Sequence, residues 1–527
     1  MTSYQLSITG PVIRSGRWIA LCLVLMLGAA CTTNPVTGER ELSLVSEQQE
    51  LAMGAQYYAP YRQQQGGDYV ADKDLTQYVQ SVAQRLVAVS DRQLPYEFHI
   101  INDSTPNAWA LPGGKIALHR GLLLALQNEA ELAAVLAHEI IHAAARHSAQ
   151  SMQRDMLLQG AVLAAGVALA DSKYQKIGAL GASLGANLTQ FHFSRDAERE
   201  SDEYGIRYMV RAGYDPQAAV SLQETFVKLK DNKAPNWLEG LFASHPPSQE
   251  RVQNNRRLVQ ALGNPGGRLG EAAYQQATAH LRQTQSAYQL YDQATAALRD
   301  KQPEQALSLV NEALQIEPKE ALFHGLRGHI RYQQGRDQAA MTNFERAIKL
   351  NPDYFEFHLA RGLLQQKRDN RIAAQRDLQV SVDLLPTPEA LFGLGELAQT
   401  AGDRKTAIEY FGQVAQSQSD LAQNAGERLA RLDLAKHPAR FLSAQLTVNP
   451  DQQVLIRVHN RSVVSVHQVR VTLGEKVGSD VQIRDSLRLA QSLAPGAEVV
   501  LKSGVRVADR AALRRLVAQV VQAQVLN

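Results

Sequence analysis

A repeat of 34 residues in the second half of the chain most constrains its fold. Prolines, alanines and glycines recur at intervals of 34 residues, except that the last glycine comes one residue early. They are Pro318, Pro352 and Pro386; Ala306, Ala340 and Ala374; and Gly328, Gly362 and Gly395. Small residues let paired helices approach closely, and proline cannot continue the helix before it. A fixed period of this length indicates stacked units that share one core. The pattern therefore predicts four helix pairs over residues 286–436.

The spacing resembles that of tetratricopeptide repeats. This resemblance implies a curved α-solenoid whose concave face holds a peptide or a protein partner. From about residue 440 the apolar period changes to two, in stretches such as "QVLIRVHN" and "VHQVRVTLG". This alternation predicts a small β-sandwich-like domain over residues 440–527, for which we expect an adaptor role.

Residues 1–30 have the pattern of a secretory signal peptide. Arg14 and Arg17 precede the apolar run "WIALCLVLML", which is too short to span a bilayer stably. A retained anchor helix is the alternative. The following "LGAAC" resembles a bacterial lipoprotein cleavage site, which implies lipidation of Cys31 and attachment to the outer membrane. Cleavage after Ala30, giving a soluble periplasmic protein, stays open.

Length and composition exclude several other classes of protein. The chain has 527 residues and a net charge of +3, and no basic run stands out. It is too long for a single core, and it lacks the electrostatic pattern of a nucleic-acid-binding protein. After removal of the signal peptide only Cys31 remains of the 2 cysteines, so no intrachain disulfide is expected.

The stretch "LAAVLAHEIIHAAARHSAQ" carries two histidines four residues apart. Asn128 and Glu131 form an asparagine version of the capping box, so a helix is expected to begin just after them. Residues four apart share one helical face, and His138 and His142 can therefore bind one ion. Glu139 can reach a water held by that ion and take its proton, as in zinc hydrolases. The alternative is a pair of satisfied core histidines.

A catalytic zinc requires a third protein ligand and one open position. His147 lies about half a turn away from the metal face of His138 and is expected to be a cation at the helix end. The stretch "FHFSRDAERESDEYG" instead offers Glu198 and Asp202 on one helical face. Glu198 can bind the metal while Asp202 orients a histidine ring. Glu200 is expected to be solvated.

Four motifs together resemble the zinc metallopeptidase family of HtpX and the CAAX prenyl proteases. They are "NAWALPGGKIALHRGLL", "HEIIHAAARH", "SRDAERESD" and "SHPPSQERV", and the likeness covers about residues 34–260. The resemblance implies one zinc per chain, held by His138, His142 and Glu198. It also implies that Glu139 and Asp202 act in catalysis.

The resemblance implies further roles around this site. His245, in "SHPPSQER", would reach the zinc from a loop and hold the enzyme latent; an ordinary loop histidine is the alternative. Arg251 would steady the scissile carbonyl. An exposed edge strand would pair with an extended substrate, and it would consist of Gly113, Gly114, Lys115, Ile116 and Ala117.

The sequence thus predicts a mainly α, multidomain protein. A zincin-type metallopeptidase domain with a small β component is expected over 31–270, before the tetratricopeptide α-solenoid of 286–436 and the β-rich domain of 440–527. The apolar stretch 157–190, rich in glycine and alanine, is expected to form a helical hairpin in the core. A mobile lid or a membrane-contacting segment is the alternative.

Two functions are compatible with this organisation. The first is a secreted zinc endopeptidase that degrades misassembled or stalled proteins of the bacterial outer membrane and periplasm. Its repeats would dock the substrate or, by resemblance, the outer-membrane assembly machinery. The second is a chaperone or scaffold for outer-membrane protein assembly, in which proteolysis is latent.

Overall fold

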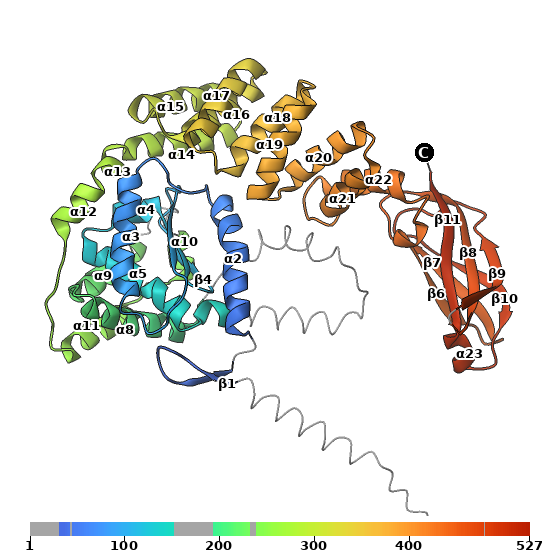
Figure 1. Ribbon diagram of the computed structural model, residues 1–527, viewed down its shortest axis with the longest axis horizontal. Helices are drawn as coiled ribbons and strands as arrows, with labels where there is room; N and C mark the ends of the chain where they lie inside the picture. Colours follow the sequence, from blue (N-terminus) through green and yellow to red (C-terminus); the bar gives the residue numbers. More distant parts are fainter. Residues whose placement is uncertain (1–30, 43–44, 152–192, 232–238, 479, 527) are drawn as a thin grey trace, which may run out of the picture. The chain divides into compact units, whose positions relative to one another are not determined.

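The computed structural model describes residues 31–42, 45–151, 193–231, 239–478 and 480–526 (Figure 1). The described residues up to Tyr354 form one compact unit, and those from Phe355 onward form a second. The predicted signal peptide and the predicted helical hairpin of 157–190 lie outside the described residues. Among the helices that the structure describes, none is both long and apolar enough to cross a membrane.

A three-stranded mixed sheet lies at the centre of the first unit. The strand order is β3-β5-β4, in which β3 (Glu97–Ile101) runs parallel to β5 (Lys115–His119) and β4 (Ala108–Leu111) runs antiparallel to β5. Two strand-like stretches at residues 98–101 and 116–118, on either side of the turn signal "PGG", predict β3 and β5, whereas the sequence pattern does not predict β4. All four residues of β4 are buried, so this strand lacks the apolar and polar alternation that marks a half-exposed strand.

The predicted exposed edge strand is wrong. β5 is the central strand and is paired with a neighbour on each side, and all of its residues are buried. The two glycines before it form the turn from β4, with φ angles of 77° and 80° that glycine adopts without strain. The correction concerns Gly113, Gly114, Lys115, Ile116 and Ala117. On this side of the sheet the edge strand is β4.

Helix α5 (Glu129–Ala144) is the central helix of the first unit. It begins as predicted, because the Asn128 side chain accepts a hydrogen bond of 2.9 Å from the Glu131 backbone N–H. All of its residues except His138 are buried. The helix packs mainly against β4, α3 (Lys73–Val87), α8 (Arg195–Arg211) and α9 (Gln217–Asp231) (Figure 1).

The predicted helix pairs of the repeats are present in both units. Their small residues lie where the paired helices meet: a Cβ added at Gly328 would lie 2.5 Å from the Phe344 ring, and one at Gly395 would lie 2.7 Å from Phe411. The first unit holds α14 (Gln285–Arg299) with α15 (Pro303–Ile316) and α16 (Ala321–Gln333) with α17 (Asp337–Leu350). The second holds α18 (Phe355–Lys367) with α19 (Arg371–Leu384) and α20 (Pro388–Thr400) with α21 (Arg404–Val414).

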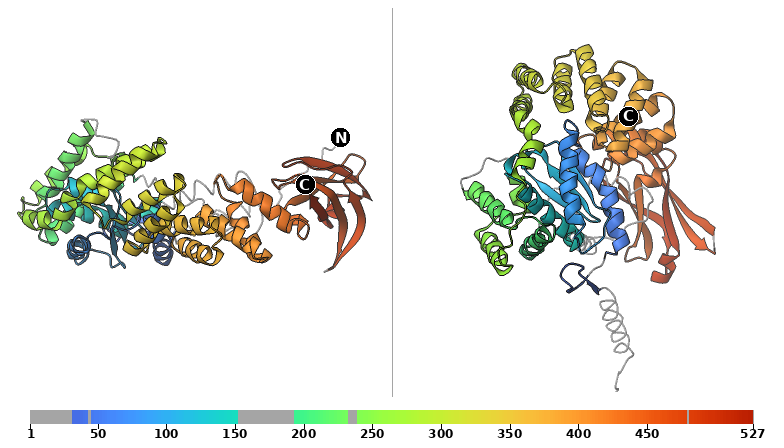
Figure 2. Two further views of the ribbon diagram at one scale, coloured as in Figure 1. Left: turned by 90° about the horizontal axis from the view of Figure 1, so that it is seen from above. Right: turned by 60° about the vertical axis from the view of Figure 1, so that its left-hand side comes forward.

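Six strands follow the repeats and form two three-stranded antiparallel sheets, in the orders β10-β7-β6 and β11-β8-β9 (Figure 2). They are β6 (Leu442–Val448), β7 (Gln453–Asn460), β8 (Val466–Val477), β9 (Asp480–Arg488), β10 (Glu498–Arg506) and β11 (Leu516–Val525). Both sheets share one apolar core with α21 and α22 (Ala422–Asp433). The predicted fold class, mainly α with a small C-terminal β domain, is confirmed, while the exact domain boundaries stay predictions.

Candidate metal centre

Two helices bring the predicted ligands together. Ser194 caps helix α8, because its side chain accepts a hydrogen bond from the Ala197 backbone N–H. The Gly205 of α8 faces α5, where an added Cβ would make an ordinary contact of 3.4 Å with the His138 backbone nitrogen. Because Glu198 and Asp202 are one turn apart on α8, both side chains face the histidines of α5.

Four side chains place donor atoms around one point. The Nε2 atoms of His138 and His142 are 3.0 Å apart, and His142 Nε2 is 3.2 Å from Glu198 Oε1. His245 Nδ1 is 3.0 Å from Glu198 Oε1 and 3.3 Å from His138 Nε2. All four donors lie within 4.8 Å of one another. A tetrahedral zinc with bonds of about 2.1 Å separates its ligand atoms by about 3.4 Å, so the group fits one zinc ion.

The outer nitrogens of the two α5 histidines also have partners. His138 Nδ1 lies 3.1 Å from Asp202 Oδ1, and His142 Nδ1 lies 3.1 Å from His147 Nδ1. A neutral imidazole that donates from Nδ1 presents the lone pair of Nε2 to a metal. Burial raises the pKa of Glu198, but the nearby His245 and His138 lower it by a larger amount. The pKa of Glu198 therefore lies well below its usual range. The ligand set therefore carries a negative charge that suits a cation.

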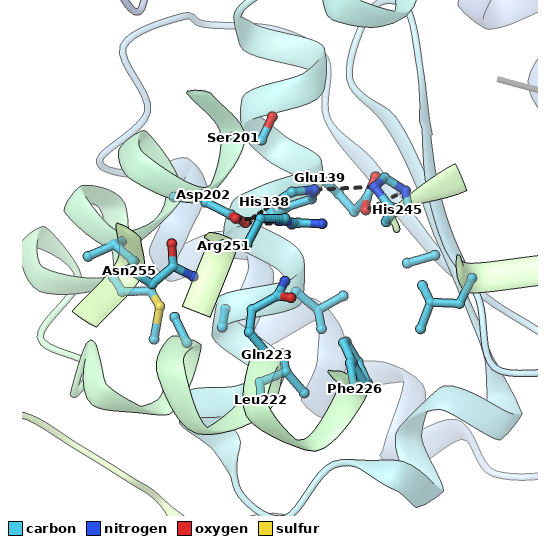
Figure 3. A pocket seen from close by; sticks show the side chains of 18 of the residues that line it. His138, Glu139, Ser201, Asp202, Leu222, Gln223, Phe226, His245, Arg251 and Asn255 are labelled. Carbon is cyan, nitrogen blue, oxygen red and sulfur yellow. Dashed lines mark hydrogen bonds and ion pairs between the residues drawn. The ribbon is translucent and has the colours of Figure 1, made fainter. Parts of the chain in front are cut away.

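Arg251 contacts the site carboxylates, and its predicted contact with a substrate carbonyl stays a prediction. Its Nε and Nη2 donate to Asp202 at 2.6 and 2.7 Å (Figure 3). Its Nη1 lies 2.8 Å from Glu198 Oε2. The guanidinium is thus already occupied. Burial raises the pKa of Asp202, but Arg251 and His138 lower it by a larger amount, so the pKa of Asp202 lies below its usual value. Arg251 keeps Asp202 charged and in position, and Asp202 in turn orients His138.

The expectation for Glu200 is wrong, and His147 lies next to His142 rather than away from the metal face; its expected positive charge stays a prediction. Helix α5 ends at Ala144, and Arg146 has a left-handed backbone with a φ of 67°. This turn brings the buried His147 back to His142, with its Nε2 3.3 Å from Glu200 Oε1. Glu200 is therefore a partner of His147 rather than a solvated group. Helical spacing could not reveal these contacts, because the helix ends before residue 147.

The sequence also gave no sign of the role of Asn34. This residue follows β1 (Cys31–Thr33) in a hairpin with β2 (Arg40–Leu42) and is fully buried. Its amide nitrogen donates to Glu41 at 2.8 Å and lies 3.4 Å from the Ala145 carbonyl oxygen and 3.3 Å from a Glu200 oxygen. The hairpin is thereby fastened to the end of the helix that carries both histidines.

Glu139 lies beside the donor group at the wall of a pocket. Its side chain is 2% exposed, and its Oε2 has no hydrogen-bond partner among the described residues. Burial raises its pKa above the usual value, although His245 and His138 oppose this shift. The pocket has a volume of about 590 Å³ including its opening to solvent, and Figure 3 shows it from close by. Much of its wall is apolar and is formed by Leu122, Val135, Ile206, Met209, Leu222 and Phe226.

Comparison with known proteins agrees with this geometry. Residues 72–259 match the model of peptidase family M48, and residues 328–368 match a TPR repeat. The chain contains an M48 peptidase domain and tetratricopeptide repeats. The match to the M48 domain includes all four donor residues together with Glu139 and Asp202. The predicted resemblance to a zinc metallopeptidase with repeats is confirmed.

Proteins similar to this chain occur in bacteria and in mitochondria. The beta-barrel assembly-enhancing protease of Yersinia pestis is 31% identical over 242 residues, which are 43% of this chain and 47% of the relative. The Escherichia coli K12 protein of that name is 27% identical over 451 residues, 78% of this chain and 90% of the relative. The mitochondrial metalloendopeptidase OMA1 of Schizosaccharomyces pombe is 34% identical over 226 residues, 42% of this chain and 64% of the relative. The chain thus spans about half the length of the Yersinia relative.

Proposed function

We propose that this chain is a zinc-dependent endopeptidase of the bacterial envelope. The observation that carries the proposal is the convergence of His138, His142 and Glu198 on one point, with the buried Glu139 beside it. Zinc held there would supply a Lewis acid for a peptide carbonyl and for the attacking water. Glu139 takes the proton of that water and returns it to the leaving amine. Asp202 keeps the His138 ring in place.

The substrate would bind as an extended chain along the unpaired side of β4, whose residues are buried in this structure and would first have to be uncovered. Pairing of this kind reads the substrate backbone, while one side chain at a time enters a pocket. The pocket beside Glu139 is walled by apolar residues such as Val135, Met209 and Phe226. Cleavage is therefore expected to depend weakly on sequence, with a preference for an apolar side chain at one position.

His245 would regulate this activity. Its Nδ1 lies within the donor group, where a fourth protein ligand would fill the position that a substrate and water require. The same observation favours the second candidate function, a chaperone or scaffold for outer-membrane protein assembly with latent proteolysis. Replacement His245→Ala is expected to raise basal cleavage severalfold. Unchanged or lower activity with zinc retained would contradict the regulatory role.

The proposed location is the periplasmic face of the outer membrane, with a soluble periplasmic protein as the alternative. It is supported by the lipoprotein-like "LGAAC" and by the likeness to assembly-enhancing proteases. A lipidated Cys31 would hold the M48 domain against the bilayer, because Asn34 is buried in that domain. Misassembled or stalled outer-membrane proteins are the proposed substrates, and the repeats would dock them or the assembly machinery.

The test of the proposed chemistry is Glu139→Gln. We expect this variant to keep its fold and its zinc but to cleave an unfolded outer-membrane protein at least about 100-fold more slowly, because the general base is lost. Glu203→Gln makes the same chemical change at an exposed position of α8 and should leave cleavage intact. If Glu139→Gln cleaves as fast as the wild type, the mechanism fails. If it lacks cleavage yet fully rescues a deletion strain, the scaffold function replaces the protease function.

A further inference from the structure

The turn after α5 returns the chain to the proposed zinc ligand His142. The backbone of Arg146 is left-handed, and the buried His147 that follows places its Nδ1 3.1 Å from His142 Nδ1. The Ser201 hydroxyl lies 3.3 Å from the same nitrogen of His147. When His142 presents the lone pair of Nε2 to zinc, its proton lies on Nδ1 and is donated to His147. The proton of His147 then lies on Nε2, 3.3 Å from Glu200 Oε1. A series of polar contacts thus joins His142 to Glu200.

The N-terminal hairpin of β1 and β2 meets this series at Asn34. The amide nitrogen of Asn34 lies 3.3 Å from the same Glu200 oxygen and 3.4 Å from the Ala145 carbonyl oxygen after α5. Its Oδ1 accepts from the backbone N–H groups of Val36 and Thr37 at 2.9 and 3.3 Å, so the hairpin itself sets the orientation of the amide. A buried amide is costly to leave unpaired. The contacts of Asn34 therefore hold the hairpin and Glu200 together.

The residues after the hairpin fasten the same turn. Arg146 Nη2 donates to the Val45 carbonyl oxygen at 2.6 Å, and its Nε donates to Glu50 at 2.8 Å. Gln150 Nε2 donates to Glu41 on β2 at 2.5 Å. A left-handed backbone is strained for arginine, and these contacts stabilise it. The turn beside the zinc ligand is thus held from the N-terminal side of the chain.

We propose that the N-terminal hairpin, through Asn34 and Glu200, is a positioning element for the zinc ligand His142. Loss of the hairpin contacts would let Glu200 and His147 turn, and the ring of His142 would lose its fixed orientation. Because coupling between two binding events is reciprocal, zinc would strengthen the docking of the hairpin by the same factor. The hairpin begins at Cys31, so a lipid attached there would be joined to the zinc site by this path.

This role rests on the proposed zinc function and adds a control of the same site from the N-terminus. The failures of the two are distinguishable. A wild-type chain that binds no zinc overturns both. Zinc binding that is indifferent to the state of the hairpin overturns the positioning role alone.

The first test compares zinc affinity in Asn34→Ala and Thr37→Ala, made in the full chain and checked for folding by circular dichroism. Each change removes one polar side chain of the hairpin, but the Thr37 hydroxyl accepts an exposed bond from Glu39 within the hairpin. Competition with a chromogenic chelator should show an affinity at least about tenfold lower in Asn34→Ala and unchanged in Thr37→Ala. Equal affinity in Asn34→Ala and the wild type would overturn the proposal.

A double variant tests whether Asn34 acts through Glu200. Glu200→Ala removes the acceptor that Asn34 and His147 share, so it should lower zinc affinity by a similar factor. Adding Asn34→Ala to Glu200→Ala should lower the affinity little further, because both changes interrupt one path. Losses that multiply in the double variant would show two independent effects and would overturn the path.

Proteolysis provides a readout in the wild-type hairpin. Arg40 is an exposed residue of β2, and trypsin can cleave after it when the hairpin opens. Zinc added to the metal-free chain should slow this cleavage at least about threefold, as mass spectrometry of the products would show. Glu198→Gln, which lacks a proposed ligand, should show no slowing. Zinc that binds the wild type without slowing cleavage after Arg40 would contradict the coupling.

Cobalt(II) in place of zinc separates positioning from general stability. Its visible absorption bands report the geometry of the ligands. They should shift in Asn34→Ala and stay unchanged in Thr37→Ala, because only the first change releases the ring of His142. Bands that are identical in Asn34→Ala and the wild type would leave the hairpin a merely structural role and overturn the proposal.

Discussion

In the helix pairs α5–α8 and α16–α17 the two helices pack against each other at a glycine, but the first interface is polar and the second is apolar. Each pair approaches closely at a glycine, Gly205 in the M48 domain and Gly328 in the repeats. The glycine of the repeats faces the aromatic ring of Phe344, whereas Gly205 faces the backbone of His138. Beside Gly205 the interface buries imidazoles and carboxylates, including Glu198.

The difference shows what a metal centre requires of a fold. An apolar interface is stabilised by the area that it removes from water, so the repeats need no ligand. A buried polar interface loses hydration and is stable only when every charge has a partner. In the M48 domain the charges of Arg251 and Asp202 neutralise each other, and zinc would neutralise the charge of the ligand set. This contrast leads to predictions for each interface.

The largest effect is expected from Asp202→Asn at the polar interface. An amide is a weaker acceptor for His138 Nδ1 and removes one of the two carboxylate partners of Arg251, so zinc affinity should fall by about 10- to 100-fold. Competition with a chromogenic chelator measures this affinity. Asp196→Asn is the matched control, because Asp196 lies on the same helix with 89% of its side chain exposed. Equal affinity in both variants would remove the orienting role of Asp202.

A smaller effect is expected from replacing either interface glycine by alanine, and it should be larger at Gly328 than at Gly205. A Cβ at Gly328 would lie 2.5 Å from the Phe344 ring, so Gly328→Ala should lower the unfolding free energy by about 1–3 kcal/mol. A Cβ at Gly205 would make an ordinary contact of 3.4 Å, and the helix preference of alanine offsets part of any strain. Urea unfolding of both variants provides the measurement, and Phe344→Leu should partly rescue Gly328→Ala. Equal losses at both glycines would break the comparison.

The smallest effect concerns pH and an ion pair of the repeats, in which the Nε and Nη2 of Arg361 on α18 donate to Asp377 on α19 at 2.6 and 2.7 Å. Burial raises the pKa of Asp377, but His358 and Arg361 lower it by a larger amount, so it lies below the usual 3.8. A lowered folded-state pKa stabilises the fold above the unfolded-state pKa, and this stability is lost as pH falls through the folded-state value. Asp377→Asn should therefore flatten the loss of stability below about pH 4, by on the order of 1 kcal/mol. Thermal unfolding across that range would contradict this if both chains lost stability in parallel.

Local spacing explains what the sequence could predict. The cap at Asn128, the helical faces of α5 and α8 and the 34-residue period all depend on residues within a few turns of one another. The strand β4 escaped prediction because its pattern is fully apolar. The contacts of His147, Asn34 and Arg251 join segments far apart in the chain or follow a left-handed residue, and no periodicity encodes them.

The most direct test of the metal centre is the zinc content of the purified protein, measured by mass spectrometry beside Glu198→Gln. The account predicts about one zinc per chain in the wild type and much less in the variant, because Glu198 places an oxygen 3.2 Å from His142 Nε2 and 3.0 Å from His245 Nδ1. Absence of zinc from both proteins, with the fold intact by circular dichroism, would contradict it, and the function would then lie with the repeats.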